Sequence, residues 1–488
     1  MAVIAKVAVQ AATYAIDKAY DYLLPEEIGG QAGCRVLVPF GRGNRLTEAM
    51  ILSLHQAVPD KPLKAVRSLL DEEPVITERE LRLALWMTRR YFCTFYDALR
   101  TVLPAAVWYH YRETWSLAQP PLVPTRQEAA VCHLLQDGPL TTDKLRQALG
   151  DDVEPLLRRM AKSGALHCKK EQSRKVRDKV VLFARLAVPA EEALALAGKS
   201  QRRREAVTFL AQNGETALHD VTYFTGVSRQ TLNALEKLGA VAYREQEEYR
   251  ISEKQYTVKA DSLTLNSQQQ HVCDTLLAQV RTETPGVTLL RGVTGSGKTV
   301  VYIRLAQELL KIGRSVMILV PEIALTPQMM ARFSAYFGDE VALLHSGLRL
   351  TERYDQWKRI RRGEAHIVLG TRSAVFAPLE NLGLIILDEE QESSYESENP
   401  PCYHARDIAK YRCFRENARL LLGSATPTVE TAYYARRGDY QLALLRRRYN
   451  QRSLPEVLVA DLKEEIRAGN SGMVGAVLRR ELAENLVR

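Results

Sequence analysis

The pattern of apolar and polar positions changes character at about residue 256. Beyond that point, short apolar runs of strand length alternate with longer stretches that carry apolar residues at helical spacing. The expected strands are 287–290, 315–320, 341–344, 367–369, 384–387 and 419–422, and the expected helices are 300–311, 327–336, 352–361, 405–416 and 429–436. This alternation predicts an α/β fold, a doubly wound parallel sheet with helices on both faces, over residues 256–455.

The pattern before residue 106 is that of a small β-rich domain. Apolar runs at 35–40 and 47–54 flank Gly41 to Asn44, which predicts two strands joined by a turn. Residues 81–103 then carry one helical pattern that ends at Pro104. We therefore expect a β-rich domain over residues 1–105.

Residues 106–255 contain an internal repeat of three helical stretches followed by a strand-like run. Helices are expected at 126–136, 142–149 and 153–162 in the first copy, and at 203–212, 218–224 and 228–238 in the second. Three helices and a hairpin are typical of a winged helix, in which Ser228 to Thr231 would begin the recognition helix. DNA contact and a spacer role between proteins are equally open functions for this winged-helix region.

Composition narrows the class of protein further. A chain of 488 residues is too long to fold around a single hydrophobic core, so about three domains are expected. The net charge of +9 suits a polyanionic partner. No apolar run reaches the length of a membrane span, and the N-terminus lacks a signal-peptide pattern. The seven cysteines form no C-x-x-C pair, so we expect neither a zinc site nor disulfides, and a reduced cytoplasmic location without membrane contact.

The most specific motif directly follows the expected strand at 287–290. It matches G-x-x-x-x-G-K-[ST], the phosphate-binding loop, and consists of Gly292, Val293, Thr294, Gly295, Ser296, Gly297, Lys298 and Thr299. Its glycines let backbone N–H groups approach phosphate, and the following helix adds a positive N-terminal partial charge. Lys298 is expected at the β- and γ-phosphates of ATP, and the Thr299 hydroxyl at Mg²⁺.

A second motif is acidic and ends the expected strand at 384–387. Asp388 is placed to order Mg²⁺ and its water shell, and Glu389 to orient or deprotonate the attacking water. An acidic strand end alone is more often plain surface. Because it follows a phosphate-binding loop on a doubly wound sheet, it predicts hydrolysis of a nucleoside triphosphate.

Four further segments stand in the order found in superfamily-two helicases, at 265–269, 321–328, 370–374 and 423–427. Residues 256–455 therefore resemble the first, RecA-like motor lobe of that family. The resemblance implies adenine contact for Gln269, single-strand backbone contact for Thr371 and Arg372, and coupling of hydrolysis to movement for Ser424 and Thr426.

Two segments depart from the family pattern. Gln391 stands where the family usually has His, and it can still bridge the γ-phosphate to the coupling motif. Residues 393–407 resemble the family's aromatic-rich, DNA-sensing loop but lack its Trp, so Tyr395 is expected to stack on a base. For Tyr403 and His404, DNA sensing and local packing remain equally open.

The chain as a whole resembles the replication-restart helicases, and this bears on its N-terminus. On pattern alone, Tyr20, Asp21 and Tyr22 belong to a half-buried strand. The resemblance implies instead a pocket for the 3′ end of a nascent DNA strand. In that pocket Asp21 accepts a hydrogen bond from the terminal hydroxyl, Tyr20 and Tyr22 flank the base, and Lys64 supplies positive charge.

The resemblance implies an ATP- and Mg²⁺-dependent 3′-to-5′ DNA helicase that recognises stalled or repaired forks and starts primosome assembly. Forked and single-stranded DNA, helicase-loader proteins and single-strand-binding protein are its implied partners. The family continues into a second lobe whose cysteine pairs bind zinc. Residues 456–488 are expected to begin that lobe, and the chain to be truncated there with little ATPase of its own. A non-motor fork-DNA-binding fragment is the alternative; a P-loop kinase is disfavoured by the ordered helicase motifs.

Overall fold

The computed structural model describes residues 2–10, 13–71, 73–119, 124–150, 153–174, 180–250, 263–449, 457–469 and 472–486. Its N-terminal part is a five-stranded antiparallel sheet in the order β2-β1-β4-β3-β5. The strands are β1 (Ala2–Val9), β2 (Tyr20–Leu23), β3 (Arg35–Phe40), β4 (Arg45–Ala57) and β5 (Ser68–Leu69). One face of this sheet encloses an apolar core of its own, and the other packs on two helices.

Those two helices correct the expectation of one continuous helical segment at 81–103. The chain forms α1 (Glu78–Tyr91) and α2 (Phe95–Val102) instead. Phe92 ends α1 in the left-handed region at φ 50°, and the Thr94 side chain caps the start of α2. A capping threonine satisfies an N–H group that a continuous helix would bond internally, so the helical pattern is divided at this point.

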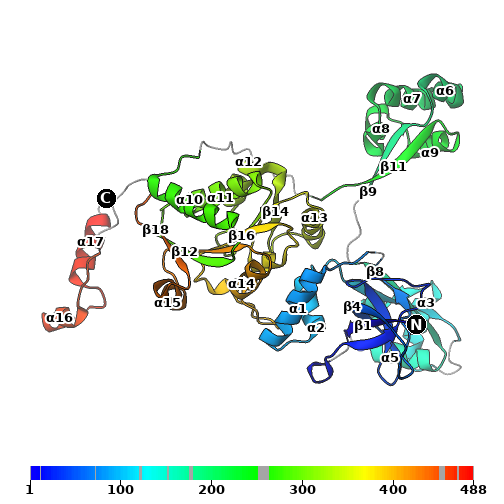
Figure 1. Ribbon diagram of the computed structural model, residues 1–488. Helices are drawn as coiled ribbons and strands as arrows, with labels where there is room; N and C mark the ends of the chain where they lie inside the picture. The colour runs from blue at the N-terminus through cyan, green and yellow to red at the C-terminus, as the bar shows by residue number, and fades with distance from the viewer. Residues whose placement is uncertain are drawn as a thin grey trace.

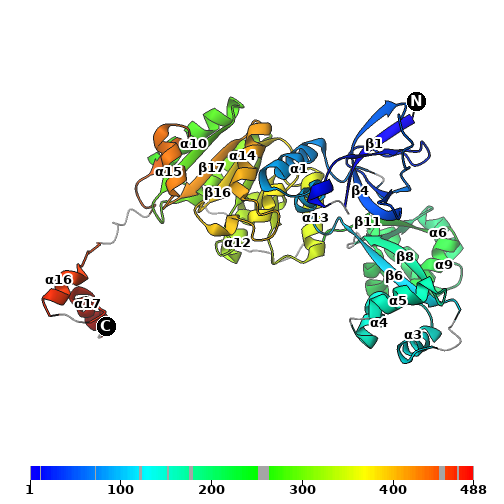
Figure 2. The same cartoon turned by 90° about the horizontal axis from the view of Figure 1, so that it is seen from below.

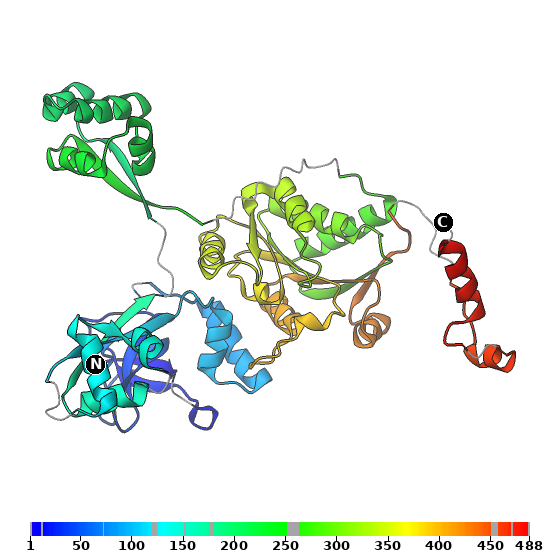
Figure 3. The ribbon, with the colours of Figure 1, turned by 180° about the vertical axis from the view of Figure 1, so that it is seen from behind.

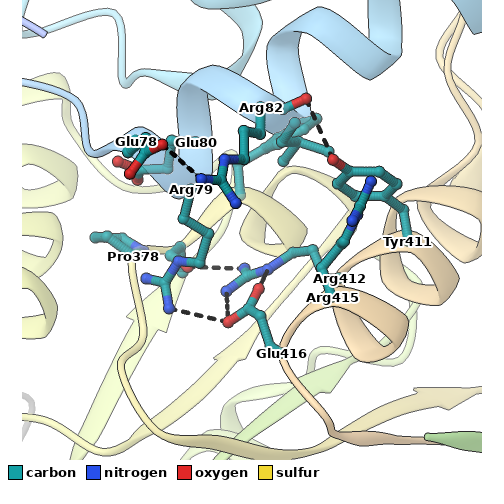
Figure 4. A pocket seen from close by; sticks show the side chains of 12 residues that line it. Glu78, Arg79, Glu80, Arg82, Pro378, Tyr411, Arg412, Arg415 and Glu416 are labelled. Atoms are coloured by element: carbon teal, nitrogen blue, oxygen red, sulfur yellow. Dashed lines mark hydrogen bonds and ion pairs between the residues drawn. The ribbon is translucent and has the colours of Figure 1, made fainter. Parts of the chain in front are cut away.

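Helix α1 joins this N-terminal part to the rest of the chain through α14 (Ala405–Arg415). Trp86 stacks on Tyr411 with ring centroids 4.6 Å apart. Figure 4 shows Arg79 and Arg412 converging on Glu416 across the same contact, beside a cavity of about 310 Å³, and the Arg79–Glu416 pair measures 3.0 Å. The aromatic stack and the ion pairs hold the two parts together from segments more than 300 residues apart in sequence.

Two units with similar element orders follow, and the second has one additional helix. The first consists of β6 (Tyr109–Leu117), α3 (Arg126–Gln136), β7 (Leu140–Thr141), α4 (Thr142–Leu149), α5 (Val153–Lys162) and β8 (Leu166–Arg174). The second consists of β9 (Val180–Leu186), α6 (Ala190–Ala197), α7 (Gln201–Asn213), β10 (Thr216–Ala217), α8 (Leu218–Thr225), α9 (Arg229–Lys237) and β11 (Val241–Glu247). Each has a three-stranded sheet and its own apolar core. The helices of the second unit stand away from the rest of the chain in Figures 1 and 3, whereas Glu247, at the end of β11, pairs with Lys358 and Arg362.

The largest part is a seven-stranded sheet in the order β14-β15-β13-β16-β17-β12-β18, with every neighbouring pair parallel. Its strands are β12 (Gly286–Gly292), β13 (Ser315–Leu319), β14 (Val341–Leu344), β15 (Ile367–Gly370), β16 (Leu382–Asp388), β17 (Arg419–Ser424) and β18 (Gln441–Leu445). This architecture confirms the predicted doubly wound parallel sheet.

Helices cover both faces of that sheet. The further helices are α10 (Ser267–Arg281), α11 (Lys298–Lys311), α12 (Pro327–Phe337), α13 (Leu350–Arg361) and α15 (Val429–Arg437). Figure 1 shows α10, α11 and α12 on one face, with α14 and α15 on the other. Each face encloses a separate apolar cluster, which is why the central strands are apolar at consecutive positions.

Two short helices end the described chain, α16 (Leu462–Arg467) and α17 (Ala476–Leu486). Neither contains a buried residue, and both lie apart from the sheet in Figure 2. Residues 457–461, which precede α16, form no strand. Among the residues described, no helix has the length and apolarity to cross a membrane.

Candidate ATP and DNA site

The phosphate-binding loop runs from the carboxyl end of β12 to the start of α11. Gly295 and Gly297 have φ of +77° and +81°, a conformation that favours glycine. The Ser296 side chain is 1% exposed, and its Oγ has no hydrogen-bond partner in the described part of the chain. A buried hydroxyl without a partner, next to the free N–H groups of a helix start, fits an anion such as a triphosphate.

The lysine of this loop is held by the predicted catalytic carboxylate. Lys298 Nζ lies 2.8 Å from Glu389 Oε1. The other carboxylate oxygen, Oε2, accepts from Gln391 Nε2 at 3.0 Å, and Gln391 Oε1 accepts from Ser424 Oγ at 2.6 Å. Ser424 Oγ in turn accepts from the backbone N–H of Thr426 at 2.9 Å. These five residues form one continuous chain of hydrogen bonds, and we call it the lysine–serine chain.

The two acidic residues at the end of β16 have different environments. Burial raises the pKa of Asp388 above its ordinary value. A 2.7 Å hydrogen bond from Tyr302 and the positive charge of Lys298 both lower this pKa, but they offset the effect of burial only in part. Burial alone would also raise the pKa of Glu389, but hydrogen bonds from Lys298 and Gln391 outweigh it and hold that pKa below its ordinary value. The backbone of Glu389 is in the left-handed region, with φ 48°. This conformation is uncommon for residues other than glycine, and where it occurs it is often at a functional site.

Three residues of this site had no role in the sequence prediction. Tyr302 is fully buried on α11 and nothing in its spacing distinguishes it from a core residue. Glu390 belongs to the same acidic run, and it binds α15 through the N–H of Thr428 at 2.8 Å. Arg406, at the start of α14, pairs with Glu390 at 3.3 Å. Glu390 therefore ties both helices to the catalytic strand end.

Gln269 is fully buried at the start of α10. Its Oε1 accepts from the N–H of Asn266 at 3.0 Å, and its Nε2 donates to the carbonyl of Ser296 at 2.9 Å. Both ends of the amide are thus engaged, and the residue braces the phosphate-binding loop in this structure. Adenine contact by Gln269 stays a prediction.

The predicted DNA-contacting residues of the lobe are unequally exposed. Arg372 is half-buried and donates to the backbone carbonyls of Ser394 and Glu396, so it joins its own segment to the aromatic-rich loop. Thr371 is 4% exposed. Contact of both residues with DNA stays a prediction.

Tyr395 does not meet the expectation of base stacking in this structure. Its ring is fully buried, and its hydroxyl donates to the carbonyls of Leu319 and Asp388 at 2.9 and 2.6 Å. Stacking needs an accessible ring face. Tyr403 is also buried, and His404 caps α14 by accepting from the N–H of Arg406, so both show the local-packing alternative.

The N-terminal residues divide between the two faces of β2. Side chains alternate along a strand, so Tyr20 and Tyr22 lie opposite to Asp21. Tyr22 is 4% exposed and its hydroxyl donates to the carbonyl of Pro39, so its ring is part of the core, and base contact by Tyr22 stays a prediction. Asp21 is exposed and lies beside Lys6 of β1. Lys64 is exposed, with its Nζ donating to the carbonyl of Gly41 at 2.9 Å.

Two family models match separate parts of the chain. Residues 6–104 match the family described as the 3′ DNA-binding domain (3′BD) of PriA, and residues 266–433 match the DEAD/DEAH box helicase family. Replication restart protein PriA of Bacillus subtilis is 34% identical over 99% of this chain and 61% of its own length. The same protein of Synechocystis is 33% identical over 95% of this chain and 57% of its own length. That of Haemophilus influenzae is 30% identical over 92% of this chain and 53% of its own length.

The parallel sheet, its phosphate-binding loop and its acidic strand end lie within the residues that match the DEAD/DEAH box helicase family, and they form a RecA-like lobe. The lobe follows a DNA-binding domain in the same chain. The chain is similar to replication restart protein PriA over nearly the whole of its own length. It spans between about half and three-fifths of the length of the relatives named here.

Proposed function

We propose that this chain binds forked DNA at a 3′ end and supplies the ATP site of a 3′-to-5′ helicase that restarts replication. Residues 1–105 bind the DNA end, 106–255 add DNA contacts, 256–455 form motor lobe 1 and 456–488 begin lobe 2. Forked and single-stranded DNA are its substrates, and helicase-loader, primosome and single-strand-binding proteins are its partners. The observation that carries the proposal is the lysine–serine chain, which links the phosphate-binding loop to the coupling motif.

The same hydrogen bonds suggest how nucleotide binding prepares hydrolysis. Mg²⁺, when bound, supplies positive charge at the phosphate oxygens, with Asp388 and Thr299 as the residues that hold it. Lys298 exchanges its ion pair with Glu389 for one with phosphate. Glu389, released from Lys298 but still held by Gln391, is then available to accept a proton from the attacking water.

Gln391→Ala is expected to weaken the stimulation of ATP hydrolysis by forked DNA. The substitution removes the only side chain that joins Glu389 to Ser424 in the described site, while leaving the phosphate-binding loop intact. ATP affinity should stay within about threefold. Stimulation of phosphate release by forked DNA, which is expected to be small in this chain, should fall about tenfold, as expected for losing one charge-assisted hydrogen bond. Gln270→Ala, on the exposed face of α10, is the control. Unchanged stimulation in Gln391→Ala would refute the coupling role.

Asp21→Ala is expected to remove the preference for a free 3′ hydroxyl. A hydrogen bond to a charged acceptor contributes about 1.5–3 kcal/mol, so affinity for a fork ending in hydroxyl should fall about tenfold or more. Affinity for a fork ending in 3′ phosphate should not change. Fluorescence anisotropy with the two forks measures this, with Asp60→Ala, an exposed carboxylate in the same domain, as the control. An unaltered chain that binds both forks equally would contradict the end-binding proposal.

A further inference from the structure

A short strap crosses the phosphate-binding loop after β18. It consists of residues 446–449, and backbone hydrogen bonds hold it at both ends. The N–H of Arg446 donates to Gln268 Oε1 at 3.1 Å, and the N–H of Tyr449 donates to the carbonyl of Gly295 at 2.8 Å. The strap therefore has a fixed position on the loop that is proposed to hold phosphate.

The ring at the end of the strap lies beside the residue expected at adenine. A Cβ placed on Gly297 would lie 3.5 Å from Tyr449 Cδ2 and 2.5 Å from Gln269 Nε2, so the ring and this amide approach the same point of the loop. The Tyr449 hydroxyl lies 3.3 Å from Thr264 Oγ1, which orients the ring. The residue nevertheless remains 48% exposed. An oriented aromatic ring with an open surface next to a triphosphate loop suits the face of a nucleotide base.

The strap is also rich in positive charge. Arg446, Arg447 and Arg448 precede Tyr449, and Arg448 Nε is buried without a hydrogen-bond partner in the described part of the chain. Cationic side chains next to an aromatic ring favour a ligand that combines a flat ring with negative charge. A nucleoside triphosphate combines both.

We propose that Tyr449 is the stacking surface for the nucleotide base, so that the strap makes the site specific for nucleotides over base-less polyphosphate. The inference rests on the proposed function, because it places the base of the ATP whose phosphates the loop would hold. Gln269 and Tyr449 then have separate roles: the amide braces the loop from beneath, and the ring covers the base.

The test compares MgATP with magnesium tripolyphosphate by isothermal titration calorimetry on the whole chain. Tyr449→Ala is expected to lower ATP affinity about tenfold or more, the usual effect of removing an aromatic partner from a base, and to leave tripolyphosphate affinity within about twofold. Tyr449→Phe should bind both ligands as the unaltered chain does. Tyr433→Ala, which removes an exposed tyrosine from α15, is the matched control and should change neither affinity.

Each other outcome rejects a specific claim. Equal losses for ATP and tripolyphosphate in Tyr449→Ala would mean that the ring only supports the loop, and a gain in ATP affinity would mean that it blocks the site; both overturn the stacking proposal. Unchanged affinities would overturn it as well. An unaltered chain that binds neither ligand would overturn the proposed ATP site itself, whereas tight tripolyphosphate binding with no added affinity for ATP would overturn the stacking proposal alone.

Discussion

Replacing Glu389 by glutamine is expected to abolish ATP hydrolysis while ATP still binds. The substitution removes the carboxylate beside Lys298 that is proposed to take a proton from water. General-base catalysis contributes about 10²–10⁴ in rate, so DNA-stimulated phosphate release should fall at least a hundredfold. Affinity for a fluorescent ATP analogue should stay within about threefold.

The hydrogen bonds around Glu389 explain why binding survives this change. The introduced glutamine keeps one oxygen for Lys298, and its new amide group would face Gln391 Nε2. Gln391 can turn its own amide over, because the Ser424 hydroxyl can accept as well as donate. The lysine–serine chain is thus preserved, with donor and acceptor exchanged in the two hydrogen bonds that Gln391 makes. Phosphate release at the unaltered rate would exclude Glu389 as the base.

The central strands of the motor lobe were predictable because both of their faces are covered. An apolar run bounded by turns is the signature of such strands, and 384–387, for example, fall within β16. The edge strand β18 gave no such signal and was missed. It pairs only with β12, and Gln441 and Leu442 at its start are exposed, so its pattern does not differ from that of a loop.

The orientation of aromatic residues was not predictable from their position in a motif. Strand alternation turns the ring of Tyr22 into the core, and the motif that resembles a DNA-end pocket gave no sign of this burial. Tyr395 is buried because its hydroxyl finds two carbonyls, at the ends of β13 and β16, that come together only in the folded sheet. The stacking of Trp86 on Tyr411 likewise depends on a contact between distant segments that no local pattern indicates.

By contrast, the proximity of Lys298 to Glu389 was predictable from the motifs and the sheet. A phosphate-binding loop follows β12 and the acidic run ends β16, and both strands pair in parallel with β17. The carboxyl ends of parallel strands lie at one edge, which is where α/β folds bind ligands. The bridging geometry of Gln391 required the structure, because a carboxamide can donate or accept at either end.

Lys298→Ala is expected to abolish productive ATP binding and leave fork binding intact. The lysine supplies a charge-assisted contact to phosphate worth about 1.5–3 kcal/mol, so ATP affinity should fall between about tenfold and 150-fold. Asp21 and Lys64, the residues proposed to hold the DNA end, lie in a separate sheet domain, so fork affinity should stay within about twofold. Lys311→Ala, an exposed lysine at the end of the same helix, is the control.

The loss of Lys298 should also be visible in the pH dependence of stability. Burial opposes the charged form of Glu389, but Lys298 helps to hold its pKa below the ordinary value. The ion pair therefore stabilises the fold at pH values above the pKa that Glu389 has in the unfolded chain. This stabilisation is lost as the pH falls through the lower pKa that Glu389 has in the folded chain. Without the lysine, burial dominates and the pKa of Glu389 should rise. The melting temperature of Lys298→Ala should then drop relative to the unaltered chain at pH 7, and drop less near pH 4.

Equal ATP affinities for Lys298→Ala and Lys311→Ala would refute the phosphate-binding role of Lys298. Loss of fork binding in a folded Lys298→Ala chain would show that the ATP site and the DNA-end site are not separable.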